Sequence, residues 1–209
     1  MDNQKILEQI RATGIVPVIK IDDTADAIPL AQALIDGGLP CAEITFRTDA
    51  AEGSIKLISD KFPDMFVGAG TVLTTEQADR AIAAGAKFIV SPGFNSKIVK
   101  HCQSKNVPIF PGCITPTEIE MAIEHGLETV KFFPAEQAGG LSMIKALAAP
   151  YTKMTFIPTG GVDTSNLAKY LEFGKIIACG GSFMIKPDLT EVTRLSKEAV
   201  AIVKNVRGA

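Results

Sequence analysis

The chain has 209 residues, a formal net charge of −2 and 46% hydrophobic residues, which suits one domain with a substantial core over residues 1–209. A charge this close to neutral argues against a nucleic-acid partner, and no apolar stretch approaches the roughly 18 residues of a membrane-spanning helix. The segment Met1–Lys5 lacks the hydrophobic part of a signal peptide, so we expect a cytoplasmic protein with no membrane partner.

Short apolar runs alternate with longer helical patterns along the whole chain. The pattern begins with a helix over about Asn3–Ala12. Eight strands are predicted next, at Ile15–Ile19, Cys41–Phe46, Met65–Val67, Phe88–Val90, Pro108–Phe110, Thr129–Phe133, Thr155–Ile157 and Ile176–Cys179. Each is followed by a predicted helix, at Thr24–Asp36, Ala50–Asp60, Thr75–Ala84, Ser96–Lys105, Pro116–Glu124, Leu141–Ala148, Ser165–Glu172 and Glu191–Val203.

This alternation predicts the fold. Glycines stand where three of the helices end, at Gly37, Gly85 and Gly126. Continuous apolar strands are typical of a parallel sheet covered by helices, and eight strand–helix units predict a closed (β/α)8 TIM barrel, here with an extra N-terminal helix. The alternative is a doubly wound open sheet. No glycine fingerprint of the dinucleotide-binding kind follows the first strand, which weakens that alternative.

Cysteine and histidine give no sign of a metal centre. The four cysteines lack the close spacing of a zinc or redox motif, and we expect reduced thiols at Cys41, Cys102, Cys113 and Cys179. The two histidines, His101 and His125, both lie in helical patterns, whereas a metal centre usually needs three or four ligands. We therefore predict neither a metal nor a cofactor.

Lys131 is the most informative residue of the chain. It lies in the apolar run Thr129–Pro134, between a valine and a phenylalanine. Burial removes hydration from an ammonium group and favours the neutral amine, which is a nucleophile able to form a Schiff base with a carbonyl substrate. The alternative is a strand-end lysine whose long side chain reaches solvent.

Polar residues mark the C-terminal end of the predicted second strand, and barrels of this kind place their active residues at the C-terminal ends of strands. Glu43, Thr45 and Arg47 alternate, so they would share one side if the strand extends that far. Arg47 can bind a carboxylate through two hydrogen bonds, and Glu43 can transfer protons. The alternative is a structural ion pair between Glu43 and Arg47.

Glycine pairs follow the last two predicted strands, in Thr159-Gly160-Gly161 and Gly180-Gly181-Ser182. The loops after these two strands often form a phosphate site, where backbone amides bind the anion. A single pair would fit an ordinary turn, but two pairs after adjacent strands favour phosphate binding.

The same segments resemble a known family, the 2-keto-3-deoxy-6-phosphogluconate aldolases, many of which also act on 4-hydroxy-2-oxoglutarate. The resemblance covers nearly the whole chain. Its most specific pieces are Glu43–Thr48, Val67–Leu73, Ser91-Pro92-Gly93, Val130–Glu136, Pro158–Val162 and Gly180-Gly181-Ser182.

The resemblance implies a homotrimeric barrel that forms a Schiff base without a metal. It assigns the Schiff-base lysine to Lys131, the proton-transferring glutamate to Glu43, and carboxylate binding to Arg47 with Thr71. By the same resemblance Phe132, next to the lysine, is expected to line the pocket. The remaining expected substrate-binding residues come from the matching motifs and include the phosphate-site glycines: Pro92, Thr159, Gly160, Gly161, Gly181 and Ser182.

The implied reaction is reversible cleavage of 2-keto-3-deoxy-6-phosphogluconate to pyruvate and glyceraldehyde 3-phosphate, a step of the Entner–Doudoroff pathway, together with cleavage of 4-hydroxy-2-oxoglutarate to pyruvate and glyoxylate. The partner is thus a phosphorylated keto acid. The alternatives are an aldolase for the 6-phosphogalactonate epimer, a phosphate-binding synthase or isomerase, a metal-dependent aldolase, and a non-catalytic ligand-binding barrel.

Overall fold

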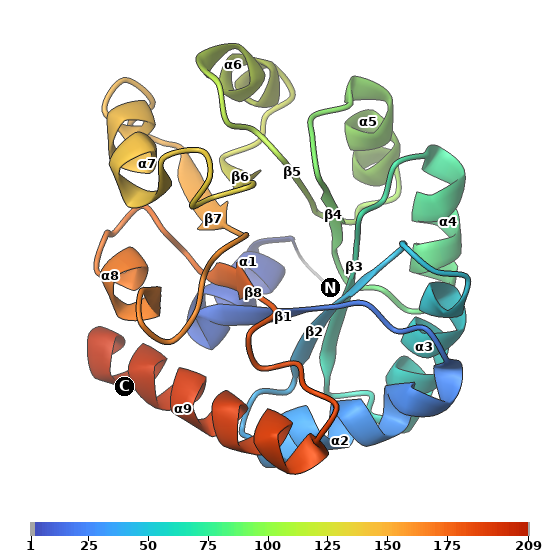
Figure 1. Ribbon diagram of the computed structural model, residues 1–209. Coiled ribbons are helices and arrows are strands. Elements are labelled where there is room, and N and C mark those ends of the chain that lie inside the picture. Colours follow the sequence, from blue (N-terminus) through green and yellow to red (C-terminus); the bar gives the residue numbers. More distant parts are fainter. Residues whose placement is uncertain (1–2, 209) are drawn as a thin grey trace.

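The computed structural model describes residues 3–208, so Met1, Asp2 and Ala209 of the expected domain lie outside the described residues. A ring of strands lies inside a ring of helices (Figure 1). The strands within residues 3–208 are β1 (Ile15–Ile19), β2 (Cys41–Thr45), β3 (Phe66–Gly70), β4 (Ile89–Ser91), β5 (Ile109–Pro111), β6 (Thr129–Phe132), β7 (Thr155–Pro158) and β8 (Cys179–Gly181).

The helices follow the predicted alternation. Over the same described range they are α1 (Asn3–Thr13), the 3₁₀ turn η1 (Thr24–Asp26), α2 (Ala27–Asp36), α3 (Ala50–Lys61), α4 (Thr75–Ala83), α5 (Ser96–Ser104), α6 (Pro116–Glu124), α7 (Gly140–Ala148), α8 (Leu167–Leu171) and α9 (Leu189–Arg207). None of them is both long and apolar enough to cross a membrane, as judged over residues 3–208.

The strands close into a barrel, as predicted. Six of them are paired in the order β5-β4-β3-β2-β1-β8, and β6 pairs with β7. All these pairs are parallel. Two bridges complete the ring, because Gly112 pairs with Lys131 between β5 and β6, and Thr159 pairs with Gly180 between β7 and β8. The open doubly wound sheet is therefore excluded.

Most strands end within one residue of the prediction, but β3 and β8 extend two or three residues further. β3 continues through Gly68-Ala69-Gly70, and β8 consists of Cys179-Gly180-Gly181, whereas the sequence placed these glycines in loops. Pairing with the neighbouring strand decides the difference. Thr45 of β2 is opposite Gly70, and Pro17 of β1 is opposite Gly181. Backbone pairing thus extends over residues whose composition is typical of turns.

The interior of the barrel is filled by aromatic rings at its N-terminal end. Phe88 stacks on Phe66, with ring centroids 5.0 Å apart, and lies 6.1 Å from Phe110. Ile6 and Ile10 of α1 belong to the same buried cluster, and α1 lies behind the ring of strands in Figure 1. The extra N-terminal helix therefore covers this end of the barrel and not the end at which the strands finish.

The four cysteines are buried and unpaired, at Cys41, Cys102, Cys113 and Cys179. Burial, reinforced by the charge of Asp79, raises the pKa of the Cys102 thiol to about 12. Burial together with the charge of Glu118 does the same for Cys113. These thiols stay protonated at neutral pH, which makes them poor nucleophiles.

Candidate active site

Lys131 and Glu43 meet inside the barrel. They come from β6 and β2, which are separated by three strands in either direction around the ring, so the two side chains reach toward each other across the interior. Lys131 Nζ lies 3.4 Å from Glu43 Oε1. The residues are only 6% and 4% exposed. Lys131 is therefore buried and paired with a carboxylate, and its side chain does not reach the solvent.

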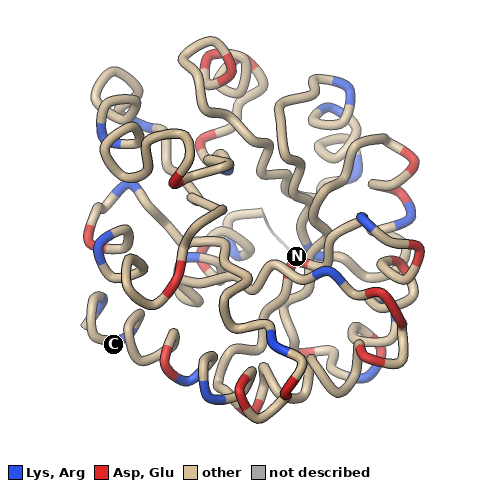
Figure 2. The backbone as a smooth tube through the Cα atoms, in the orientation of Figure 1, with Lys and Arg blue, Asp and Glu red and all other residues tan. Residues whose placement is uncertain are grey.

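A charged pair inside the barrel is unusual in this protein, because most charged residues lie on the helices and loops around the barrel (Figure 2).

Glycine at position 70 makes room for Glu43. A Cβ atom on residue 70 would lie 2.0 Å from Glu43 Oε1 and 2.7 Å from its Cγ. Because these distances are far below van der Waals contact, only glycine admits the carboxylate in its present position. The motif of residues 67–73 thus contributes to the site because Gly70 has no side chain and leaves room for the Glu43 carboxylate.

A small cavity lies beside this pair, and Thr159 shares it. Its apolar lining comes from Ile10, Val16, Phe88, Val90, Phe110 and Ile157. The hydroxyl of Thr159 is buried and has no hydrogen-bond partner among the described residues. Leaving a buried hydroxyl unpaired costs about 1–3 kcal/mol. We therefore expect a substrate atom or a water molecule to bind it.

Arg47 lies in the turn after β2 and is exposed at the open end of the barrel. Its Nε donates to the hydroxyl of Thr45 at 3.1 Å, and this hydroxyl in turn donates to the carbonyl of Ile19 at 2.9 Å. Thr45 is buried, so this pair of hydrogen bonds fixes one edge of the guanidinium. The ion pair that forms inside the barrel joins Glu43 to Lys131 and does not include Arg47.

Thr71 and Pro92 lie at the same end of the barrel, after β3 and β4. Thr71 has a φ of 55°, a left-handed conformation that is rare for a β-branched residue. Such strain is concentrated at functional sites. The carbonyl of Pro92 approaches Gly112 so closely that a Cβ there would lie 2.0 Å from it. Gly112 is also the bridge partner of Lys131, which connects the Pro92 loop to the lysine strand.

The two predicted glycine pairs come together because β7 and β8 are neighbours. Gly160 and Gly161 have φ values of 101° and 78°, which favour glycine over other residues. Gly181 is buried at the end of β8, and Ser182 is exposed directly after it. Among the described residues, the backbone amides of Gly161 and Ser182 make no hydrogen bond. Unpaired amides of this kind can bind an anion.

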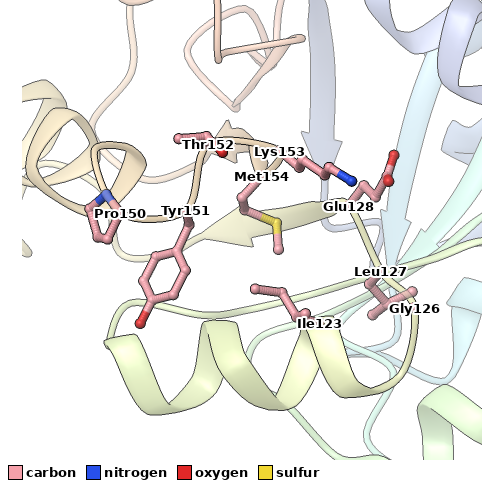
Figure 3. Close-up of a pocket in the computed structure, with 9 residues that line it drawn as sticks. All are labelled: Ile123, Gly126, Leu127, Glu128, Pro150, Tyr151, Thr152, Lys153 and Met154. Atoms are coloured by element: carbon pink, nitrogen blue, oxygen red, sulfur yellow. The ribbon is translucent and has the colours of Figure 1, made fainter.

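Figure 3 shows a separate hollow of about 400 Å³, which none of these residues lines. It is formed by Ile123 near the end of α6 and by the segments that precede β6 and β7, including Leu127, Tyr151 and Met154. These segments are at the N-terminal ends of the strands, opposite the end that carries Arg47 and Thr71. The hollow therefore does not belong to the Lys131 site. Within residues 3–208, no three His, Cys, Asp or Glu side chains are grouped to hold a metal ion.

A family model described as KDPG and KHG aldolase matches residues 6–203. The chain belongs to the KDPG and KHG aldolase family. It is 48% identical to a 2-dehydro-3-deoxy-phosphogluconate aldolase of Treponema pallidum, over 95% of this chain and 97% of that protein.

Two solved aldolase structures agree with this assignment. One is the 2-keto-3-deoxy-6-phosphogluconate aldolase of Zymomonas mobilis with 3-phosphoglycerate, with 40% identity, a TM-score of 0.91, and coverage of 95% of this chain and 96% of that one. The other is the KDPG aldolase of Legionella pneumophila, with pyruvate captured as a covalent carbinolamine. The two chains are 34% identical with a TM-score of 0.85, and the match covers 96% of this chain and 97% of the Legionella chain.

The structure places Phe132 apart from Lys131. Phe132 is fully buried in the outer core under the helices, on the opposite face of β6 from Lys131. The ring near the lysine belongs to Phe133, whose centroid lies 5.2 Å from Lys131 Nζ. Alternation along a strand explains this placement, since immediate neighbours point to opposite faces. The same rule, applied to the sequence, identifies Phe133 as the residue that shares the side of Lys131.

Other functional contacts of the aldolase have weaker signals in the sequence. Gly70 is one glycine of a glycine-rich motif, and nothing in the motif shows that it limits the position of Glu43. Glu136 also lies in a motif, but its partner Tyr170 lies in a distant segment. A tyrosine inside a predicted helix is usually a core residue, so nothing in the local pattern points to this pair.

Proposed function

We propose that this aldolase reversibly cleaves 2-keto-3-deoxy-6-phosphogluconate to pyruvate and glyceraldehyde 3-phosphate through a Schiff base on Lys131. We include cleavage of 4-hydroxy-2-oxoglutarate to pyruvate and glyoxylate. The observation that carries the proposal is the buried amine of Lys131, 3.4 Å from the carboxylate of Glu43 across the barrel. The substrates come from the names of the family and of its relatives.

The proposed steps begin with attack of the Lys131 amine on the C2 carbonyl, which gives a carbinolamine. Loss of water then gives a protonated imine. Glu43 accepts the proton of the C4 hydroxyl, directly or through a water, as the C3–C4 bond breaks. The electron pair of that bond moves to the imine and leaves an enamine, while C4 departs as the aldehyde. Return of the proton to C3 and hydrolysis of the imine release pyruvate and the free amine.

The substrate is proposed to lie across the open end of the barrel. Arg47 and Thr71 hold the carboxylate, and the ring of Phe133 covers one side of the reacting carbon. Thr159, whose buried hydroxyl lacks a partner among the described residues, and Pro92 complete the central pocket. The phosphate binds at Gly160, Gly161, Gly181 and Ser182. Holding both ends aligns the keto carbon with the amine. Such orientation can lower the activation barrier by several kcal/mol.

Borohydride reduction tests the Schiff base directly. With pyruvate present, borohydride should inactivate the enzyme and add a reduced pyruvate group to Lys131, located by mass spectrometry of peptides. A synthase or isomerase that uses the lysine only for its charge, a metal-dependent aldolase and a non-catalytic barrel all predict no adduct. An adduct on another lysine would contradict the assignment.

Glu43→Gln should separate imine formation from carbon–carbon cleavage. The amide keeps the shape of the side chain but cannot accept the proton, so kcat should fall by about 10²–10⁴-fold, the usual contribution of a general base. Trapping of pyruvate should persist. Stopped assays of pyruvate release and borohydride labelling measure the two steps, and unchanged turnover would remove Glu43 from the mechanism.

Thr45→Val should weaken the binding of the substrate carboxylate by Arg47. The variant keeps the side-chain shape but removes the hydroxyl that accepts from Arg47 Nε. Loss of a hydrogen bond worth about 1–2 kcal/mol should raise KM by about 5–30-fold with a smaller change in kcat. Thr48→Val is the matched control, because the hydroxyl of Thr48 donates to the carbonyl of Ile21 and makes no hydrogen bond to Arg47 among the described residues. Equal effects of both variants would contradict the role of Thr45.

Ser182→Glu should act on phosphorylated substrates. A carboxylate at this exposed position would repel the phosphate, so KM for 2-keto-3-deoxy-6-phosphogluconate should rise by at least about tenfold. Cleavage of unphosphorylated 4-hydroxy-2-oxoglutarate should change much less. Steady-state kinetics with the two substrates makes the comparison. Similar damage to both would place the phosphate elsewhere.

We further propose one domain over residues 1–209, a homotrimer and a cytoplasmic location. The family match over residues 6–203 supports the single domain, and the unpaired cysteines fit a reducing compartment. Light scattering should give a mass three times that of the 22.2 kDa chain. A comparison of turnover on the 6-phosphogluconate and 6-phosphogalactonate epimers decides between this substrate and the alternative epimer.

A further inference from the structure

The segment that follows Lys131 is attached to the proposed phosphate loop. The amide of Ala135 donates to the carbonyl of Thr159 at 2.8 Å, and the amide of Glu136 donates to the carbonyl of Gly160 at 3.1 Å. The side chain of Glu136 lies directly against Gly161, where a Cβ atom would be 2.5 Å from Glu136 Cγ. A carboxylate-bearing side chain is therefore in contact with the loop proposed to bind a phosphate.

Tyr170 of α8 holds this carboxylate. Its hydroxyl donates to Glu136 Oε1, and the tyrosine is only 1% exposed. Burial, with the hydrogen bond to Glu136 and its charge, raises the pKa of the Tyr170 hydroxyl, so it stays a donor at neutral pH. Gly140 leaves room for the contact, because its Cβ would lie 3.1 Å from the Tyr170 hydroxyl and 3.2 Å from Glu136 Oε1.

The same short helix supports the loop at a second point. Asn166 immediately precedes α8, and its Nδ2 donates to the carbonyl of Gly161 at 2.8 Å. Its Oδ1 accepts from the amide of Asp163 at 2.9 Å. Asn166 and Tyr170 are four residues apart, so they lie on one face of the helix. One contacts Gly161 directly, and the other acts on it through Glu136.

The place of the Glu136 carboxylate has an electrostatic consequence. Two negative charges close together at a protein surface repel each other, so a carboxylate that entered the loop would weaken phosphate binding. Glu136 and Tyr170 both line a hollow of about 490 Å³ that also contains Lys145 and Lys169, between α7 and α8. The hydroxyl of Tyr170 thus keeps the carboxylate on the outer side of the Gly160-Gly161 loop, toward these lysines and away from the barrel opening.

We infer that Tyr170 is a positioning residue for phosphorylated substrates: by holding Glu136 on the outer side of Gly161, it keeps a negative charge out of the phosphate site. This inference depends on the proposed phosphate site and deepens it. It concerns only the phosphate end, so Schiff-base formation with pyruvate does not require it.

Tyr170→Phe is the test, because it removes the hydroxyl and keeps the ring. KM for 2-keto-3-deoxy-6-phosphogluconate should rise by about 5–30-fold, the scale of one hydrogen bond to a charged group. Cleavage of 4-hydroxy-2-oxoglutarate should change less than about twofold, and trapping of pyruvate on Lys131 should be unchanged. Tyr151→Phe is a matched control, since Tyr151 also bonds a glutamate, Glu120, at 2.9 Å, but at the far end of the barrel.

A double variant separates the electrostatic role from a structural one. If the freed charge of Glu136 causes the loss, Glu136→Gln combined with Tyr170→Phe should bring KM back to within about threefold of the original enzyme. No recovery, or equal damage to both substrates, would overturn the inference, as would an unchanged KM in Tyr170→Phe. Absence of trapping in the unmodified enzyme would instead overturn the proposed Schiff base, so the two failures are distinguishable.

Discussion

Lys131→Ala is expected to abolish borohydride trapping with pyruvate and to lower kcat/KM by at least about 10⁴-fold, the scale on which loss of a covalent nucleophile acts. No other amine can take its place, because the residues around it in the cavity are apolar apart from Glu43 and Thr159. Trapping followed by peptide mass spectrometry and pyruvate release measure the two losses together.

The variant also removes the partner of a buried carboxylate. Glu43 is only 4% exposed and would be left without the ammonium group 3.4 Å away. An unpaired buried charge destabilises a fold, so circular dichroism should confirm that the variant is folded before its kinetics are compared. Lys20→Ala is a suitable control, since Lys20 follows β1 at the same end of the barrel but is exposed and paired with Asp22. Loss of turnover without loss of trapping would show that Lys131 is not the Schiff-base residue.

The barrel could be predicted because its signal is repeated eight times in the sequence. Each apolar strand and its helix gives a weak local pattern, but the period and the closing glycines of the helices agree with one another. The ends of β3 and β8 could not be predicted in the same way. Gly70 and Gly181 are in strands because they pair with β2 and β1. Pairing between distant strands cannot be recognised from the local sequence of either one.

The candidate site shows the same limit at the level of side chains. Lys131 stands out in the sequence because a charged residue in an apolar strand is conspicuous, and Glu43 because it alternates with Thr45 and Arg47 at the end of a strand. The same alternation places Phe133 on the side of Lys131. Tyr170 and Glu136 are 34 residues apart. Their contact depends on how α8 packs against β8 and α9, which is a property of the folded barrel and not of either segment.

Gly70→Ala is expected to lower kcat by at least about 10²-fold while the protein remains folded. The new Cβ would lie 2.0 Å from Glu43 Oε1. The strand backbone is fixed by its pairing with β2, so the flexible carboxylate must move, and a general base displaced from its place loses about 10²–10⁴-fold in rate. Pyruvate should still be trapped on Lys131, since the nucleophile is unchanged. Rapid-quench measurement of the cleavage step tests the effect.

The stability of this variant distinguishes displacement of Glu43 from a general collapse of the barrel. Overpacking of this size costs about 1–3 kcal/mol, so the midpoint of urea unfolding should fall modestly and the unfolding transition should stay cooperative. Gly174→Ala is the matched control, because a Cβ at Gly174 meets no atom within 4 Å. Adding Glu43→Gln to Gly70→Ala should cause little further loss, because both changes remove the same base. A full additional loss of 10²-fold or more would mean that Gly70 acts on catalysis by a route that does not pass through Glu43.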